Sequence, residues 1–254
     1  MEIDEKKFRR LFFVVFLRTF FLQSVWNFKG MQNLGFLFVI KPVLDFLYKG
    51  DERTRAYLRH MDFFNTHPFC ASYIIGIVIK AEKNYATTGD EKFLQEISGA
   101  KKVLGGPVAA FGDSIIWGFL RPFVALLASF FVFCFSKDVS KMFIGPLIAF
   151  FGFNFFHLQL RWKGLKQGFE YGIEAIDRIF TGKLHFQIGL LRTTSIVLIV
   201  LLLIKGFMAL EVSIFLKIIY PVVFVGIVFF LRNVSPVLLF YGIFLLGILC
   251  AGLS

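Results

Sequence analysis

Two apolar stretches of this sequence carry polar side chains at their centres. The first contains the run Asn-Thr-His-Pro at positions 65–68, and the second contains an Asp-Ser pair at 113–114, with Trp117 shortly after it. Amide, hydroxyl, imidazole and carboxylate groups together can both donate and accept hydrogen bonds. We therefore treat both stretches as candidate ligand-binding segments, although polar groups at such places can also serve only to satisfy the backbone.

The usual catalytic signatures are missing. The four histidines, at 60, 67, 157 and 185, do not form an HExxH pattern, and the three cysteines stand singly. GxSxG, a phosphate-binding GK[ST] loop and paired cysteines are also lacking. The sequence thus predicts no catalytic residue, no metal and no cofactor, and we keep an enzyme using His67 and His157 as metal ligands only as an alternative.

The composition is that of an integral membrane protein. Hydrophobic residues make up 57% of the 254 residues, including 37 Phe, and the mean hydropathy is +0.73. The net charge of +11 is typical of a membrane protein whose basic cytoplasmic loops face anionic lipid. It would indicate nucleic acid binding only in a chain without apolar spans, with basic patches and interleaved aromatic residues. We expect an all-α fold with amphipathic N-terminal helices and C-terminal transmembrane helices.

The elements that hold the candidate segments are predicted to be discontinuous. Pro68 disfavours helical geometry at His67, so one helix should end near Asn65 and another begin at Pro68. Helix ends that meet in this way leave free carbonyls and amides beside a ligand site. The simpler alternative is a proline kink whose polar side chains satisfy the loosened backbone.

The stretch 104–122 is predicted to be irregular and re-entrant. Gly105, Gly106, Pro107 and Gly112 interrupt it, and backbone at membrane depth that is not helical must find partners other than lipid. Asp113 would then cap a helix over 114–120. Gly-Pro at 145–146 is expected to be a further break.

Four regions follow from the distribution of charge within what we expect to be a single domain over 1–254. They are an amphipathic or interfacial region at 1–62, a broken-helix membrane core at 63–160, a cytoplasmic connection at 161–192 and transmembrane helices at 193–254. Glycines at 164, 168 and 172 are spaced to let another helix approach closely. The charge-free segment 233–254 is the best single transmembrane helix, with a cytoplasmic start.

An indole and several amides lie in the apolar N-terminal region. Trp26, Gln32 and Asn33 could contact a ligand or form hydrogen bonds between helices. The spacing alone favours the structural role.

The motifs in this order resemble one known family. Phe-Phe-Asn-Thr-His-Pro at 63–68, Gly-Pro-Val-Ala-Ala-Phe-Gly-Asp-Ser at 106–114 and Trp-Asn at 26–27 are similar to those of component IID (EIID) of the mannose/fructose/sorbose family of bacterial phosphotransferase-system (PTS) sugar permeases. Met-Gln-Asn-Leu-Gly at 31–35 and Gly-Pro at 145–146 extend the resemblance over nearly the whole chain.

The resemblance implies a multi-pass subunit of the bacterial cytoplasmic (inner) membrane that forms a hetero-oligomer with component IIC. Together they would bind a hexose and pass it to cytoplasmic IIA and IIB, which carry the phosphoryl group, so IID itself would not be an enzyme. The sugar would be bound by polar groups of the two candidate segments, and possible secondary contacts come from the indole and amide side chains. The predicted binding residues are Asn65, Thr66, His67, Asp113 and Ser114, with Trp26, Gln32, Asn33 and Trp117 as secondary ones.

The sequence departs from the family pattern at Phe28-Lys29-Gly30, where an acid is usual, and the region between Gly172 and the final helix is shorter than in typical members. A non-transporting structural or regulatory membrane subunit of a reduced system is therefore the alternative function.

Overall fold

The computed structural model describes residues 4–180, 183–209, 219 and 222. Every regular element longer than an isolated bridge in this part of the chain is a helix, which confirms the all-α prediction. The chain divides into two compact units, Met1–Ile199 and Val200–Ser254. The first unit contains all of the candidate site residues.

Helices α1 to α4 form a compact N-terminal group. α1 begins where the Asp4 carboxylate accepts a hydrogen bond of 3.0 Å from the Lys7 amide, as an N-cap does. A single turn, η1, continues it, and α2, α3 and α4 follow. The bounds are Glu5–Arg18 for α1, Thr19–Phe21 for η1, Asn33–Leu47 for α2, Gly50–His60 for α3 and Ala71–Thr88 for α4.

The apolar core lies where α2 and α4 pack together. Phe36 and Val39 of α2 and Ile74 and Ile77 of α4 are each fully buried. In α2 the buried residues recur at helical spacing on one face, whereas α4 is buried on all sides from Ala71 to Ile79 and forms the centre of the group. The loop between α3 and α4 is thereby held against the same core.

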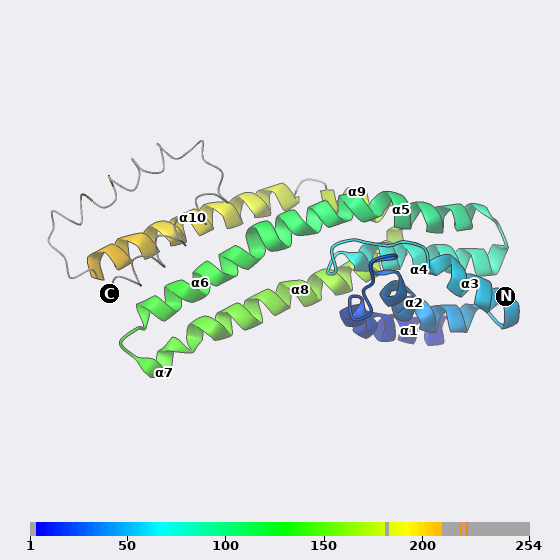
Figure 1. Ribbon diagram of the computed structural model, residues 1–254, viewed down its shortest axis with the longest axis horizontal. Coiled ribbons are helices and arrows are strands. Elements are labelled where there is room, and N and C mark those ends of the chain that lie inside the picture. The colour runs from blue at the N-terminus through cyan, green and yellow to red at the C-terminus, as the bar shows by residue number, and fades with distance from the viewer. Residues whose placement is uncertain (1–3, 181–182, 210–218, 220–221, 223–254) are drawn as a thin grey trace, which may run out of the picture. The chain divides into compact units, whose positions relative to one another are not determined.

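A long helical hairpin follows the N-terminal group (Figure 1). Its first arm is a single run of helix, 43 residues from Lys92 to Cys134. The arm turns at the short helix α7, and α8 returns beside α6. The bounds are Lys92–Gly112 for α5, Asp113–Leu120 for the π-helical segment η2, Arg121–Cys134 for α6, Val139–Met142 for α7 and Ile144–Tyr171 for α8. Helices α9, Glu174–Phe180, and α10, Lys183–Ala209, complete the described elements.

The prediction of a broken, re-entrant segment at 104–122 is wrong. Pro107 lies inside α5, and the helix continues with wider π-type turns through η2. The glycines allow close approach of other backbone and side chains, as the site below shows, instead of interrupting the helix. Asp113 is consequently an interior helical residue and not an N-cap.

Gly145 and Pro146 also do not break a membrane segment. They lie in the first turn of α8, where the missing proline N–H has no intrahelical partner to lose. A Cβ at Gly145 would be 2.5 Å from the Ala128 carbonyl oxygen of α6. Pro146 is therefore compatible with the start of α8, and Gly145 allows α8 to pack closely against α6.

The break predicted at Pro68 is present. α3 ends at His60 and α4 begins at Ala71, so the discontinuity is an irregular segment of ten residues rather than a sharp junction. The predicted cytoplasmic connection starts inside a helix, since α8 runs without interruption through Arg161.

The predicted small-residue contact is real for two of the three glycines. A Cβ at Gly164 would be 2.8 Å from the Tyr73 ring, and one at Gly168 would collide with the Tyr73 carbonyl oxygen. Gly76 of α4 faces the same crossing. Gly172 instead ends α8 with a φ of +64°, a conformation that glycine adopts without strain.

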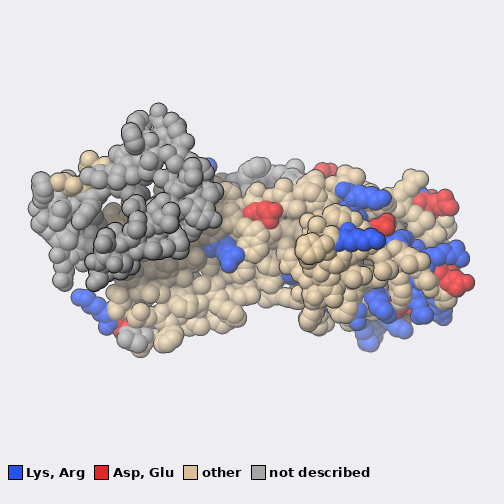
Figure 2. Space-filling view, in the orientation of Figure 1, with Lys and Arg blue, Asp and Glu red and all other residues tan. Residues whose placement is uncertain are grey.

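Among the residues that the structure describes, three helical segments are long and apolar enough to cross a membrane, at Lys92–Cys134, Ser140–Tyr171 and Gly189–Gly206. At 1.5 Å per residue the first measures about 65 Å, roughly twice the hydrocarbon thickness, so part of it must lie outside the hydrocarbon. Lys and Arg side chains gather over the N-terminal group and the start of α5 (Figure 2). The predicted transmembrane helix at 233–254 lies outside the described residues.

Candidate functional site

The irregular segment between α3 and α4 is held in place by one buried amide. The side chain of Gln32 donates to the Thr66 carbonyl at 2.8 Å and accepts from the Thr66 amide at 3.1 Å. The Gln32 amide thus satisfies both backbone hydrogen-bonding groups of Thr66, as a neighbouring β-strand would do. Because Gln32 is only 2% exposed, it supports the segment from behind and has no free polar group for a ligand.

The same segment packs against α5 at two glycines, Gly105 and Gly112, which have no side chain to keep it away. The Thr66 hydroxyl donates to the Gly105 carbonyl at 2.9 Å, and a Cβ at Gly105 would be 3.0 Å from the Asn65 carbonyl oxygen. A Cβ at Gly112 would collide with the His67 ring. The glycines that the sequence marks as helix breakers therefore admit the Asn-Thr-His segment to the surface of a continuous helix.

His67 joins the two candidate segments. Its ring centroid lies 5.5 Å from that of Trp117 and 5.2 Å from that of Phe69. Its Nδ1 accepts a hydrogen bond of 3.3 Å from the Phe69 amide, so the proton of the neutral ring is on Nε2. That Nε2 is buried without a hydrogen-bond partner in the described part of the chain.

The other predicted binding residues differ in exposure. Asn65, Asp113, Ser114 and Trp117 all lie at the surface, and the Asn65 side chain forms no hydrogen bond with the residues that the structure describes. Thr66, by contrast, is buried and its hydroxyl is already used. The four exposed side chains are therefore an amide, a carboxylate, a hydroxyl and an indole, and of these the indole of Trp117 contacts His67.

Trp117 also lines an open groove of about 600 Å³ between the two arms of the hairpin. Arg121, whose guanidinium lies 5.1 Å from the Trp117 ring, and Asn154 line it too. The remaining lining is apolar, from Val124, Ala125, Pro146, Ala149, Phe150 and Phe153.

The secondary residues Trp26 and Asn33 do not join this cluster. The Asn33 side chain accepts from Asn27 at 2.9 Å and donates to the Met61 carbonyl at 2.5 Å, and it thereby fixes the turn before α2. Trp26 packs on Phe28, with ring centroids 4.9 Å apart. The amides of this region are used as the structural alternative predicts.

Arg161 is a buried residue near the site that sequence reasoning missed. It is 4% exposed, and it donates to the Thr19 carbonyl at 2.6 Å and to His157 Nε2 at 2.9 Å. Its guanidinium carbon lies 5.0 Å from the Phe69 ring centre. The signal in the sequence was an arginine four residues after a histidine, which places both on one helix face.

A second unpredicted feature is a buried carboxylate. Glu82 of α4 accepts from Arg59 Nε and Nη2 at 2.7 and 2.5 Å, from the Tyr48 hydroxyl at 2.6 Å and from His60 Nε2 at 2.7 Å. A carboxylate only accepts, so the His60 proton is on Nε2. Burial alone would raise the pKa of Glu82, but the hydrogen bonds from Arg59 and His60 outweigh it and lower the pKa to about 2. Burial lowers the pKa of His60, which therefore stays neutral.

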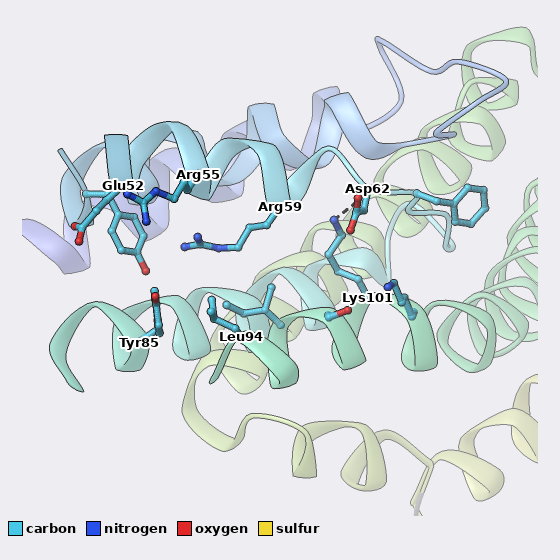
Figure 3. A pocket seen from close by; sticks show the side chains of 12 residues that line it. Glu52, Arg55, Arg59, Asp62, Tyr85, Leu94 and Lys101 are labelled. Atoms are coloured by element: carbon cyan, nitrogen blue, oxygen red, sulfur yellow. Dashed lines mark hydrogen bonds between the residues drawn. The ribbon is translucent and has the colours of Figure 1, made fainter. Parts of the chain in front are cut away.

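The Glu82 cluster adjoins a cavity of about 410 Å³ between α3 and α5 (Figure 3). Charged and aromatic side chains of α3, α4 and α5 reach into it. Separately, no group of three His, Cys, Asp or Glu side chains that could hold a metal is found in the described part of the chain.

The fold and the site define a helical membrane protein in which an irregular segment packs on a long membrane hairpin. The chain belongs to the PTS system mannose/fructose/sorbose family IID component, whose pattern matches residues 3–254.

Curated relatives agree with this assignment. The chain is 38% identical over 173 residues to the PTS system mannose-specific EIID component of Escherichia coli K12, which covers 67% of this chain and 59% of the relative. It is 34% identical over 180 residues to the fructose permease IID component of Bacillus subtilis, covering 70% and 62%. The matched part thus spans about three fifths of the length of these relatives.

Solved structures resemble the chain over nearly its whole length. One is a chain of the mannose transporter ManYZ in complex with microcin E492, with a TM-score of 0.58, 28% identity and 96% coverage of both chains. A second, described as a membrane protein, has a TM-score of 0.70 and 27% identity, again over 96% of both chains.

Proposed function

We propose that this chain is the membrane-embedded IID subunit of a mannose-family PTS sugar permease. With a IIC partner it forms the pathway that binds a hexose and delivers it to IIB for phosphorylation. The observation that carries this proposal is the family match over residues 3–254 together with the 96% coverage of a ManYZ transporter chain. The chain acts in the bacterial cytoplasmic membrane and is not phosphorylated itself.

The sugar contacts come from the exposed part of the site. Asp113 accepts hydrogen bonds from two sugar hydroxyls, the Asn65 amide donates and accepts, and the Ser114 hydroxyl adds a further contact. Trp117 offers an apolar face to the C–H groups of the sugar ring. His67 and Thr66 position the segment from behind, because both are buried.

The IIC partner completes the pocket. Asp113 and Trp117 lie at the surface, and the groove beside Trp117 is open. A transported sugar has to be enclosed in order to be selected, so the missing wall is supplied by the partner within a hetero-oligomer.

Sugar uptake tests the proposal. In a strain that lacks its own mannose-type permease, the chain is expressed with its IIC, IIA and IIB components, and uptake of labelled mannose, fructose and sorbose is measured. We expect Asp113→Asn to reduce uptake about tenfold or more, since a hydrogen bond to a charged group is worth about 1.5–3 kcal/mol. Asn65→Ala should reduce it about three- to tenfold, because the hydrogen bonds of a neutral amide are worth about 0.5–1.5 kcal/mol each. Asp51→Asn, which alters an exposed acid of α3, serves as the matched control.

The outcomes separate the site from the function. Wild-type uptake in both site variants would show that the sugar contacts lie elsewhere while the permease role stands. No uptake of any hexose by the wild-type complex would favour the structural or regulatory role. Immunoblots of membranes establish that all variants are present at equal amounts.

A further inference from the structure

The cavity between α3 and α5 is separate from the proposed sugar site. Its volume of about 410 Å³ lies in the range of small-molecule pockets. Arg55 and Arg59 of α3 and Lys101 of α5 lie within it (Figure 3). The wall also includes Glu52, Asp62, Tyr48, Tyr85, Ser98 and Lys102.

Arg59 is held rigidly at this wall. Two of its nitrogens bind Glu82, and its guanidinium carbon lies 5.2 Å from the Tyr48 ring centre and 5.5 Å from that of Tyr85. Its Nη1 forms no hydrogen bond with the described residues. The buried carboxylate therefore fixes an arginine in one orientation and leaves one edge of it available, which is how a binding group is preorganised.

Lys101 adds a second fixed cation. It is 4% exposed, and its Nζ donates to the carbonyls of His60 at 3.2 Å and Asp62 at 3.5 Å. Its Nζ also lies 5.2 Å from the Phe36 ring centre, so Lys101 contributes its positive charge to this wall of the cavity from a fixed position. Arg55 and Lys102 are exposed and form no ion pair within the described part of the chain.

The charges are arranged with the cations between two acids. Figure 3 shows Arg55, Arg59 and Lys101 between Glu52 and Asp62. Arginine and lysine donors suit the oxygens of a phosphate group, while carboxylates, Ser98 and the tyrosine rings suit hydroxyls and the faces of a sugar. A ligand that combines a phosphate with several hydroxyls matches the whole lining.

We propose that this cavity is a binding site for a soluble sugar phosphate. The identity of the sugar moiety rests on the proposed function, because phosphorylation of the transported hexose yields such a compound on the cytoplasmic side. The phosphate lies among Arg55, Lys101 and Lys102 next to the free edge of Arg59, and the sugar hydroxyls bind Glu52 and Asp62.

Calorimetry tests this directly. The chain, purified with its IIC partner in phosphatidylcholine nanodiscs, is titrated with mannose 6-phosphate, mannose and inorganic phosphate. We expect mannose 6-phosphate to bind more tightly than inorganic phosphate. Arg55→Gln and Lys102→Gln should each raise its Kd about tenfold and leave mannose binding unchanged, because each removes one charge-assisted contact from an exposed position. Arg59 is left intact because its loss would strand the buried Glu82.

Arg53→Gln is the matched control, since Arg53 is exposed on α3 and does not line the cavity. An equal loss in this variant, or no binding of mannose 6-phosphate to the wild type, would overturn the proposal. Equal affinity for inorganic phosphate would reduce the cavity to a general anion site. Loss of binding in phosphatidylglycerol nanodiscs would identify a lipid headgroup as the occupant, and both results would refute the sugar phosphate.

The two proposals fail independently. If mannose uptake is normal and no sugar phosphate binds, only the cavity assignment is wrong. If the sugar phosphate binds in wild type and not in Arg55→Gln while no hexose is transported, the permease role is wrong and the cavity stands.

Discussion

Two side chains with the same functional group have different roles in this protein. Gln32 and Asn65 are both amides in an apolar region, yet Gln32 is consumed by the backbone of Thr66 and Asn65 is exposed. Residue type and spacing do not distinguish them, because the difference lies in which backbone atoms come near in the folded chain. The same holds for His60, which binds Glu82 from 22 positions away in the sequence.

The Glu82 cluster makes stability depend on pH. The pKa of Glu82 is lowered from 4.5 to about 2 on folding, so its stabilising contribution is complete above pH 4.5 and is lost as the pH falls toward 2. The pKa of His60 is lowered from 6.5, so the unfolded chain takes up a proton first and stability already declines below pH 6.5. Both groups therefore destabilise the protein in acid.

We expect the melting temperature of the purified complex to fall steadily from pH 7 to pH 4. His60→Gln, which keeps an amide donor toward Glu82, should flatten the part of the curve between pH 6.5 and 5. The measurement is thermal unfolding in detergent followed by intrinsic fluorescence at each pH. An unchanged pH profile in this variant would exclude His60 as the group responsible.

At the scale of helices, glycine determines which elements touch. The α4–α8 crossing uses Gly76, Gly164 and Gly168, and α5 receives the candidate segment at Gly105 and Gly112. Such close approach brings many atoms into van der Waals contact, which adds to the burial of apolar side chains around α4. These five glycines therefore mark contacts within continuous helices and not helix breaks.

Gly168→Ala should destabilise the protein by about 1–3 kcal/mol, the usual cost of overpacking, because the added Cβ meets the backbone of Tyr73. Gly106→Ala is the control, since nothing lies within 4 Å of its added Cβ, and a neutral or slightly stabilising effect is expected. Thermal melting of both variants in the same detergent gives the comparison. Equal melting temperatures of the two variants would show that α4 and α8 can move apart to accommodate the added Cβ without loss of stability.

At the scale of the molecule, the hairpin and the basic N-terminal group predict the orientation in the membrane. Lys and Arg gather over α1 to α4 and the start of α5, whereas the tip at α7 carries Lys137 and Lys141 beside Asp138. The positive-inside rule then places the N-terminal group in the cytoplasm and the tip outside.

Cysteine labelling checks this orientation. In a background with Cys70, Cys134 and Cys250 replaced by serine, Lys137→Cys should react with a membrane-impermeant maleimide added to intact cells. Arg53→Cys, exposed on α3, should react only after the membrane is permeabilised. The reverse pattern would invert the topology and place the α3–α5 cavity outside the cell, away from any internal sugar phosphate.

The sequence by itself determined the all-helical membrane class, the family, the break at Pro68 and the close contact at Gly164 and Gly168. These follow from composition, motif order and local spacing, which neighbouring residues fix. Only the tertiary structure decided that 104–122 is one continuous helix. Gly105 and Gly112 are in contact there with Asn65 and His67, which lie about 40 positions earlier in the sequence. It also decided that Asp113 is an interior helical residue and that Glu82 gathers Tyr48, Arg59 and His60. Such contacts join residues far apart in the chain, and local patterns do not encode them.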